Sequence, residues 1–453
     1  MAKIFGTDGI RCLVNQEPMT AETCLKIAKS AGYILSNNKS SRNIVIISKD
    51  TRLSGYLFEP LITAGFISMG MDVILVGPLP TPSLPLLIKL LRANMGVMIT
   101  ASHNTYEYNG LKFFDHRGKK INKILETKIE NIIFSQTKYN KILNITHDSG
   151  KAFRLEDAQE RYLKYLISAL NKNIKLKKFK IILDCAHGAT YKIAPQLFSK
   201  LGTKVITLND KPSGININKG CGAIDTSQLS KKVVENKGDI GFAFDGDGDR
   251  LIVVDEKGNI IDGDKIIALF AKYLLKSKKL NKKIIVTTVM SNLAFEQYLN
   301  NILGIKLIRT MVGDVNVISE MEKNLYTLGG EQSGHIIFGN YLNTGDGMLA
   351  ALKILEIMSL EKISTSKIFN LYKNFPQLKT NIPLPSKLSV TFDKNLEKLT
   401  LSYQKQNPEL RFLLRKSGTE PLLRILVEGK NEITVKKVSS QLNQQIKKIF
   451  NAK

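Results

Sequence analysis

Tryptophan is absent from the 453 residues, and cysteine occurs only four times, as Cys12, Cys24, Cys185 and Cys221. The cysteines are scattered without CxxC spacing, which argues against a disulfide framework and against a zinc site. No run of 18 or more apolar residues occurs, so a membrane-spanning helix is not expected. The P-loop pattern GxxxxGK[ST] is also missing, which argues against a nucleotide site of the ATPase kind.

The chain starts with MAKIFGTDGIR, which lacks the apolar core of a signal peptide. We therefore expect a cytoplasmic protein without a membrane partner. The length and the 43% hydrophobic content are sufficient for several domains with cores of their own.

Acidic residues are few relative to basic ones, 40 against 66, and the formal net charge is +26. A nucleic-acid-binding protein could have this charge. However, the lysines are spread along the chain, and aromatic stacking platforms between them are not evident without tryptophan. We expect no nucleic-acid partner and interpret the lysine runs as solvated faces, whose positive field would favour a phosphorylated small molecule.

Apolar runs alternate with amphipathic segments over most of the chain. This pattern predicts helices over 20–36, 56–69, 156–170, 191–201, 226–236, 264–276 and 292–303, and strands over 43–48, 72–76, 97–99, 111–114, 180–184, 204–208, 239–244, 283–288 and 306–309. A loop is predicted around Pro78, Pro80, Pro82 and Pro85. Further strands over 378–382, 411–415 and 422–427 precede a helix over 434–450.

Repetition of this α/β unit predicts three doubly wound α/β domains with mixed sheets, over residues 1–154, 155–256 and 257–373. The change of pattern near residue 374 predicts a smaller C-terminal α+β domain over 374–453. No linker is rich in glycine or serine, so the domains are expected to pack against each other.

The segment GVMITASHNTYEYNGLKFF, residues 96–114, places a polar cluster at the end of an apolar strand. Ser102 lies beside His103, and Lys112 follows on the next strand, after a turn predicted at Asn109-Gly110. A serine hydroxyl needs basic or cationic neighbours to act as a nucleophile. The pattern indicates a group that accepts and donates phosphate, although an ordinary polar loop would have the same composition.

The motif DGDGDR follows the apolar strand before residue 245 and supplies Asp245, Asp247 and Asp249, with Arg250 next. Carboxylates on alternate residues can turn onto one hard cation, and oxygen ligands suit Mg²⁺. A calcium loop is an alternative, because Glu256 fills its twelfth position, but the flanking segments are predicted strands. A purely structural Asp/Gly turn is a second alternative.

The motif GEQSGH contains Glu331, Ser333 and His335 on alternate residues. A carboxylate and a hydroxyl are suited to binding sugar hydroxyls, and a histidine can move a proton near neutral pH. The alternative is a histidine with a structural role in a loop.

The motif RKSGTEPLLR combines hydroxyls, a glycine and arginines, which can cradle phosphate. Near the N-terminus, the two glycines of FGTDGIR precede Arg11, which could also fork onto phosphate oxygens. A polar turn between two strands is the alternative for the first of these motifs.

Taken together, these motifs give the chain a resemblance to the α-D-phosphohexomutase superfamily, most closely to its phosphoglucosamine mutase branch. The resemblance covers essentially the whole chain and rests on FGTDGIR, TASHN with NGLKFF, DGDGDR, GEQSGH and RKSGTEPLLR in that family's order. The family's usual residues are replaced at Cys12, Thr105, His187 and Val315-Asn316. Family members have four domains around a central cleft, and each domain contributes one loop.

The resemblance implies a role for each loop. The first domain would provide a phosphoserine at Ser102, and the second would bind one Mg²⁺ per subunit. The third would contact the sugar through Glu331 and Ser333, and the fourth would clamp phosphate. The implied metal ligands are the Ser102 phosphate, Asp245, Asp247 and Asp249, and the implied clamp comprises Arg415, Ser417, Gly418, Thr419 and Arg424.

The expected reaction is the interconversion of glucosamine 6-phosphate and glucosamine 1-phosphate, which feeds UDP-N-acetylglucosamine and cell-wall synthesis. A hexosamine 1,6-bisphosphate would be its intermediate and primer. Arg11, Lys112 and Arg250 are the expected nearby cations, and Lys112, His103 and His335 are alternative proton acceptors. A phosphomannomutase/phosphoglucomutase of the same superfamily is the alternative function, and the oligomeric state, a homodimer included, is left open.

Overall fold

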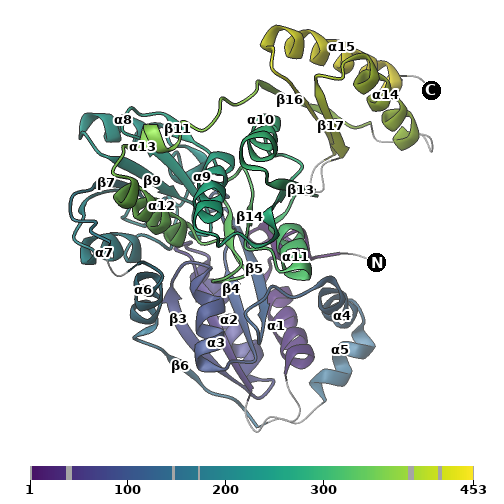
Figure 1. The fold of residues 1–453 in the computed structure, drawn as a ribbon. Helices are drawn as coiled ribbons and strands as arrows, with labels where there is room; N and C mark the ends of the chain where they lie inside the picture. The colour runs from purple at the N-terminus through teal and green to yellow at the C-terminus, as the bar shows by residue number, and fades with distance from the viewer. Residues whose placement is uncertain are drawn as a thin grey trace.

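The structure is a computed structural model that describes residues 3–36, 43–144, 148–171, 174–385, 392–416 and 421–451. It contains four sheets, one per domain (Figure 1). Three sheets are mixed and covered by helices, and the fourth is antiparallel, so the expected three α/β domains and smaller α+β domain are confirmed. Within these residues, no helix has the length and apolar character needed to cross a membrane.

The first domain has a six-stranded sheet of order β1-β5-β4-β2-β3-β6. Its inner strands are parallel, and β5 is antiparallel to both of its neighbours. The strands are β1 (Ile10–Leu13), β2 (Asn43–Lys49), β3 (Met71–Pro78), β4 (Met95–Ile99), β5 (Tyr108–Asp115) and β6 (Ala152–Arg154), and the helices are α1 (Ala21–Leu35), α2 (Gly55–Ile67), α3 (Ser83–Leu91), α4 (Lys123–Ile133) and α5 (Gln136–Leu143).

Both faces of this sheet are buried, as a doubly wound domain requires. Successive residues of β2 face different cores: Val45 and Ile47 belong to one cluster and Ile46 to another. The first cluster includes residues of α1 and α2, and the second includes residues of α3. The continuous apolar run in the sequence reflects this burial on two sides.

The second domain has the strand order β11-β10-β9-β7-β8 and the third has β13-β12-β14-β15. The second comprises α6 (Ala158–Ser168), β7 (Lys180–Asp184), α7 (Ile193–Lys200), β8 (Lys204–Leu208), α8 (Ser227–Glu235), β9 (Ile240–Phe244), β10 (Leu251–Asp255) and β11 (Ile260–Ile261). The third comprises α9 (Gly263–Lys276), β12 (Ile284–Thr288), α10 (Leu293–Gln297), β13 (Lys306–Thr310), α11 (Asp314–Asn324), β14 (Leu328–Gly330), β15 (Ile336–Phe338), α12 (Gly347–Glu361) and α13 (Thr365–Ile368). Single turns of 3₁₀-helix occupy Gly222–Ile224 and Asn281–Lys283, and a π-helical turn extends α10 over Tyr298–Ile302.

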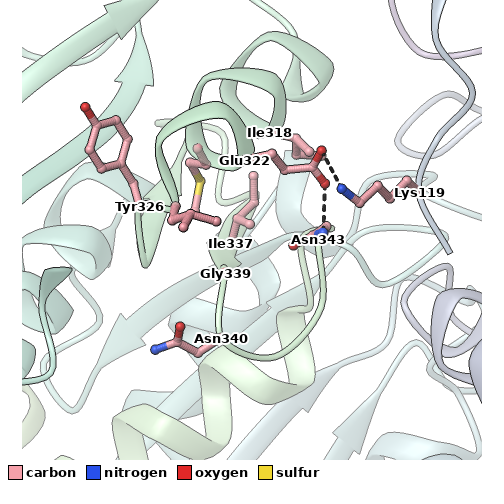
Figure 2. Close-up of a pocket in the computed structure, with 10 residues that line it drawn as sticks. Lys119, Ile318, Glu322, Tyr326, Ile337, Gly339, Asn340 and Asn343 are labelled. Carbon is pink, nitrogen blue, oxygen red and sulfur yellow. Dashed lines mark hydrogen bonds and ion pairs between the residues drawn. The ribbon is translucent and has the colours of Figure 1, made fainter. Parts of the chain in front are cut away.

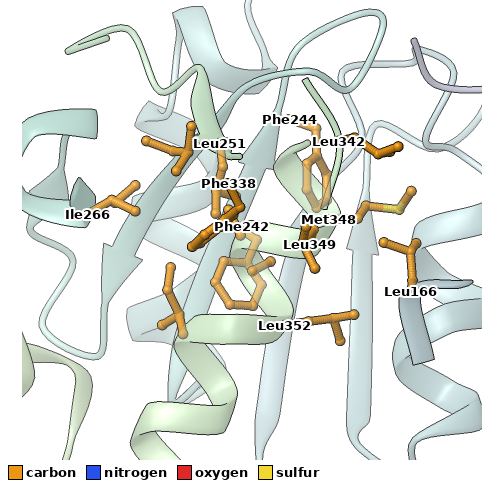
Figure 3. Close-up of a cluster of buried hydrophobic side chains, with 14 of the residues drawn as sticks. Leu166, Phe242, Phe244, Leu251, Ile266, Phe338, Leu342, Met348, Leu349 and Leu352 are labelled. Carbon is orange, nitrogen blue, oxygen red and sulfur yellow. The ribbon is translucent and has the colours of Figure 1, made fainter. Parts of the chain in front are cut away.

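One apolar cluster runs through the first three domains without interruption, and Figure 3 shows its part between the second and the third. Helix α12 lies within it, with Leu349 and Leu352 close to Phe242 of the second sheet. This helix is apolar on nearly all sides, as a helix buried between sheets must be. The first three domains therefore form one packed body, as expected from the lack of flexible linkers.

The fourth domain has its own apolar cluster and lies beside the third (Figure 1). Its antiparallel sheet has the order β16-β18-β17, and its elements are β16 (Gln377–Pro383), α14 (Phe392–Gln406), β17 (Arg411–Lys416), β18 (Leu422–Glu428) and α15 (Glu432–Asn451). Polar contacts join it to the third domain: Arg411 donates to the main-chain oxygens of Val289 and Ser291, and Glu428 accepts from the amide of Leu293.

All predicted helices and strands are present, with bounds within three residues of those expected. Two local predictions are wrong. The proline-rich segment is not only a loop, because α3 begins at Ser83 and includes Pro85 in its first turn, where a missing amide costs no helical hydrogen bond. Asn109-Gly110 is not a turn but part of β5, with Gly110 opposite Arg11.

Gly110 lies where two backbones approach closely. A Cβ at this position would be 2.2 Å from the main-chain oxygen of Ile10 and 2.8 Å from that of Thr100. Both atoms belong to backbone and cannot rotate away. Glycine is therefore required by the packing of β1 against β5 rather than by a turn.

We expect Gly110→Ala to lower the free energy of unfolding by about 1–3 kcal/mol, the usual cost of overpacking. The measurement is the unfolding midpoint in urea. Gly55→Ala is the matched control, because its Cβ would meet only the Lys49 side chain, at 3.3 Å. Equal midpoints for the two variants would contradict this account of Gly110.

Candidate active site

The polar loops found in the sequence follow the carboxyl ends of parallel strands in three different sheets. Ser102 follows β4, Asp245 follows β9 and Glu331 follows β14. Such strand ends are the usual ligand sites of α/β domains. The Ser102 hydroxyl donates to Asp245 Oδ2 at 2.7 Å, and both side chains are buried. The first two loops therefore meet at the candidate nucleophile.

Arg52 supports the Ser102 loop through hydrogen bonds to its main chain. Its side chain is buried and is oriented by Asp50, whose carboxylate lies 2.8 Å from Nε. The guanidinium donates to four main-chain oxygens of the loop, those of Ser102, Asn104, Thr105 and Tyr108. Sequence reasoning missed Arg52, although it follows β2 and shares its sheet edge with Ser102.

A second support comes from the neighbouring domain. The Asn218 amide donates to the oxygens of Ser102 and Asn104, both at 2.8 Å. Ser102 itself has φ of +49°, a left-handed conformation that is uncommon for serine. A Cβ on Gly246 would lie 2.6 Å from the Ser102 oxygen, so the glycine of DGDGDR allows the two loops to touch.

Asp245, Asp247 and Asp249 are buried, and one carboxylate oxygen of each lies within 4.8 Å of the others. Asp247 Oδ1 accepts no hydrogen bond from any described residue. Three buried carboxylates with an unsatisfied oxygen fit a hard cation such as Mg²⁺. Glu256 is not part of this cluster, because it accepts from the amide and hydroxyl of Ser366, so the calcium-loop alternative lacks its twelfth ligand.

The pKa values reflect this crowding. Burial and the like charges of Asp249 and Asp247 raise the pKa of Asp245 well above its usual range. For Asp249, burial acts in the same direction, but Lys112 and His335 outweigh it and hold its pKa well below the usual range. Negative charge is therefore in excess around Asp245, whereas neighbouring basic groups offset it around Asp249.

Lys112 is the buried cation beside the cluster. Its Nζ lies 2.8 Å from Asp247, 3.1 Å from Asp8 and 3.3 Å from Asp249. Burial alone would lower the pKa of Lys112, but these carboxylates raise it well above its usual range. Asp247 also accepts a hydrogen bond of 2.6 Å from Thr81, so the proline-rich segment supports the cluster.

Three further predicted residues surround the Ser102 loop. Arg11 donates to the side chain of Asn104 at 2.9 Å. The Nε atom of Arg250 lies 3.9 Å from both Asp245 and Asp249. Burial, together with Arg250 and Arg11, lowers the pKa of His103 to about 3, so its imidazole is neutral near pH 7.

The GEQSGH loop places His335 against the carboxylate cluster. Its Nδ1 lies 3.4 Å from Asp249, and its Nε2 accepts from the amide of Gly345 at 3.0 Å. Glu331 accepts from the amide of Gly313 and from the Ser333 hydroxyl, at 3.1 and 3.3 Å. Ser333 is exposed. The carboxylate and hydroxyl expected to meet a sugar are thus adjacent.

The predicted phosphate clamp lies on the fourth sheet. Arg415 and Arg424 are directly opposite in the pairing of β17 with β18, so their side chains share one face. Burial and the neighbouring Arg424 lower the pKa of Arg415. An anion would relieve this like-charge contact. Ser417, Gly418 and Thr419 lie outside the described residues.

Three of the positions that depart from the family pattern have a defined conformation or contact. His187 has φ of +50°, a conformation for which the family's usual asparagine is better suited. Thr105 accepts from Arg52, and Asn316 donates to the main-chain oxygen of Val312 at 3.1 Å. None of these residues belongs to the carboxylate cluster.

The chain is similar to known proteins over its whole length. Models of the phosphoglucomutase/phosphomannomutase family match all four domains: α/β/α domain I over residues 2–140, domain II over 160–258, domain III over 262–375 and the C-terminal domain over 407–445. Phosphoglucosamine mutase from Thermodesulfovibrio yellowstonii is 45% identical, with 97% of this chain and 98% of that protein covered. Phosphoglucosamine mutase from Desulfotalea psychrophila is 43% identical over the full length of both.

Solved structures show the same fold at low sequence identity. A phosphoglucomutase/phosphomannomutase family protein from Burkholderia thailandensis superposes with a TM-score of 0.83, with 22% identity and coverage of 98% and 97% of the two chains. An N-acetylglucosamine-phosphate mutase in its product complex superposes with a TM-score of 0.63, with 18% identity and coverage of 98% and 96%. Because its sequence identity to these relatives extends over their full length, the chain belongs to the phosphoglucosamine mutases, isomerases of the phosphohexomutase superfamily.

Proposed function

We propose that this chain interconverts glucosamine 6-phosphate and glucosamine 1-phosphate through phosphorylated Ser102. The observation behind the proposal is the buried Ser102 hydroxyl, which donates at 2.7 Å to a carboxylate of a three-aspartate cluster that Lys112 also contacts. The full-length relatives are named as phosphoglucosamine mutases, which favours this substrate over mannose or glucose phosphates.

In the forward direction, the bond between phosphorus and Ser102 Oγ breaks while a bond from O1 of glucosamine 6-phosphate to phosphorus forms. The O1 proton passes to His103 or His335, because Lys112, whose pKa is raised well above its usual range, already carries its proton. The resulting 1,6-bisphosphate turns over, its 6-phosphoryl group returns to Ser102 Oγ while O6 takes up the proton, and glucosamine 1-phosphate is released. Such a transfer depends mainly on alignment and on charge stabilisation, which Lys112, Arg11 and Arg250 would supply.

Mg²⁺ held by Asp245, Asp247, Asp249 and the Ser102 phosphate would supply positive charge to the transferring group. Glu331 and Ser333 would orient the sugar hydroxyls. Arg415 and Arg424, with Ser417, Gly418 and Thr419, would bind the phosphate that is not reacting, so that one site can serve both ends of the sugar.

We place the four domains at residues 1–154, 155–256, 257–373 and 374–453. In support of these bounds, each segment contains one complete sheet, apart from Ile260–Ile261, a two-residue strand that crosses from the third segment to pair with β10 of the second. Each segment then contributes one loop to the reaction: phosphoserine, metal, sugar and phosphate.

The first prediction concerns Ser102. Intact-mass measurement of the active protein is expected to show a species heavier by one phosphate, and Ser102→Ala should lose both this species and the turnover of glucosamine 6-phosphate. Ser168→Ala, at an exposed serine of α6, is the control and should retain both. Turnover by Ser102→Ala at the wild-type rate would overturn the phosphoserine mechanism, and a preference for mannose or glucose 6-phosphate would overturn the proposed substrate.

The second prediction concerns Asp247. Asp247→Asn is expected to reduce kcat by ~100-fold or more, since it weakens a cation site at the reacting group; relief of like charge in the cluster and loss of the ion pair with Lys112 act on stability in opposite directions. EDTA should abolish wild-type activity reversibly. Asp157→Asn, a surface residue paired with Arg161, serves as the control. Full activity in metal-free buffer would contradict the assignment.

The third prediction concerns Arg415. Arg415→Ala removes a charged fork from the non-reacting phosphate, and the variant is expected to release 1,6-bisphosphate into solution, as detected by mass spectrometry during turnover. Lys416→Ala is the matched control, because Lys416 is adjacent on β17 but pairs with Asp393 at 2.7 Å. Retention of the intermediate equal to that of the control would argue against this role of Arg415.

A further inference from the structure

Six ionisable side chains from three domains form a closed ring of contacts around the candidate site. In ring order they are Asp314, Lys120, Asp8, Lys112, Asp249 and His335. Acidic groups alternate with basic ones throughout. We call this set the charge ring. Lys112 and His335 were expected from the sequence, whereas Asp8, Lys120 and Asp314 have no role in the proposed reaction.

Lys120 is the link between the first and third domains in this ring. Its ammonium contacts Asp8 of the N-terminal loop and Asp314 at the start of α11. The side chains of Lys120 and Asp314 are 9% and 7% exposed, so both charges have lost most of their water. A buried ion pair of this kind adds little stability over an apolar pair, which leaves positioning as its main effect.

The backbone that carries Lys120 is held firmly. The Asp115 carboxylate accepts from the amides of Arg117 and Lys119, at 2.9 and 3.0 Å. Lys120 also bridges to Phe114 of β5, two residues from Lys112. The backbone of Lys120 is therefore fixed relative to the strand that carries Lys112.

One carboxylate paired with Lys120 is that of Asp8, which lies toward the Ser102 loop. The other oxygen of Asp8 lies 3.1 Å from Lys112. Asp8 is also 3.8 Å from Arg11, which donates to Asn104 of the Ser102 loop. Asp8 thus connects Lys120 to two of the three cations proposed to face the transferring phosphate, Lys112 and Arg11.

The other carboxylate paired with Lys120 is that of Asp314, which lies toward the GEQSGH loop. Asp314 Oδ2 lies 3.4 Å from His335 Nε2, and the preceding residue, Gly313, donates to Glu331. Gly313 therefore orients the carboxylate of the GEQSGH loop, and Asp314 lies beside its histidine. The contacts of Lys120 with Asp8 and Asp314 tie the sugar loop to the phosphoserine loop.

We propose that Lys120 is a positioning residue that sets the distance between the bound sugar hydroxyl and phosphorylated Ser102. This inference rests on the proposed function. Lys120 acts through Asp8 and Asp314 and does not contact the reacting atoms. A misplacement of about 1 Å between reacting groups can cost ~100-fold in rate, so a fixed spacing across two domains has a direct effect on kcat.

The chain provides a matched control in the adjacent residue. Lys119 also joins the first domain to the third: its Nζ lies 2.9 Å from Glu322 of α11, which accepts from Asn343 at 2.7 Å (Figure 2). These groups lie at a cavity of about 220 Å³ on the outer side of α11. Lys119 therefore joins the same two domains without reaching the charge ring.

The experiment compares Lys120→Met with Lys119→Met. For Lys120→Met we expect kcat to fall by ~100-fold while KM for glucosamine 6-phosphate stays within about threefold, because the sugar and phosphate ligands remain. Lys119→Met should keep both constants near the wild-type values. A rise in KM with unchanged kcat, or equal effects of the two variants, would overturn the proposal.

A second readout does not depend on activity. Hydrogen exchange at residues 312–316 and 102–105 should be faster in Lys120→Met than in Lys119→Met, with no difference in α7. Equal exchange in the two variants would overturn the proposal even if the wild-type protein proved to have a different substrate. A wild-type protein without mutase activity would overturn the proposed function alone.

Asp8→Asn provides the same test if Lys120→Met does not fold. Of the two carboxylates that Lys120 contacts, Asp8 is the more exposed, at 21%, so its substitution disturbs folding less. It should show the same fall in kcat with little change in KM. The double variant Asp8→Asn/Lys120→Met should lose less than the product of the two single losses, because both changes break the contact between Asp8 and Lys120. Losses that multiply would overturn the proposal.

Discussion

Lys112, buried among three carboxylates, is the interaction on which the site depends. Asp8 comes from the N-terminal loop and Asp247 and Asp249 from the second domain, so a single ammonium ion neutralises charge from two domains. Without it, the buried aspartates would lack their neutralising partner, and an unpaired charge in a protein interior is strongly destabilising. The cluster that holds this cation also accepts the hydrogen bond of the Ser102 hydroxyl, where a phosphoryl group would need positive charge.

The packing of the domains suits this concentration of charge. The first three domains share one continuous apolar cluster, so their loops are held in fixed relative positions. The fourth domain has a separate cluster and meets the third through polar contacts at Arg411 and Glu428. The loop proposed to bind phosphate is therefore carried by the unit with the least apolar attachment to the others. Transfer chemistry needs fixed geometry, and the part proposed to bind the non-reacting phosphate is joined most loosely.

Support for the reactive serine comes from groups around it more than from its own loop. Arg52 satisfies four main-chain oxygens, and Asn218 binds two of the same oxygens from another domain. These bonds hold Ser102 in a left-handed conformation that its local sequence would not favour. The close approach of Gly246 completes the support, because any larger residue would separate the two loops. The nucleophile is thus oriented by contacts between segments more than 40 residues apart.

The sequence by itself determined the order of helices and strands and the chemistry of each loop. These features follow from local patterns: burial on both faces gives continuous apolar strands, and alternate carboxylates around glycine suggest a cation site. The tertiary structure alone decided which loops meet. Arg52, Asn218 and Lys120 have no local signature, because their function depends on the distance to residues in other segments. Asn109-Gly110 illustrates the same limit, since a dipeptide typical of turns lies within β5, where the close backbone of Ile10 requires glycine. Local patterns encode backbone conformation and burial, whereas contacts between domains depend on how the sheets and the shared apolar core pack.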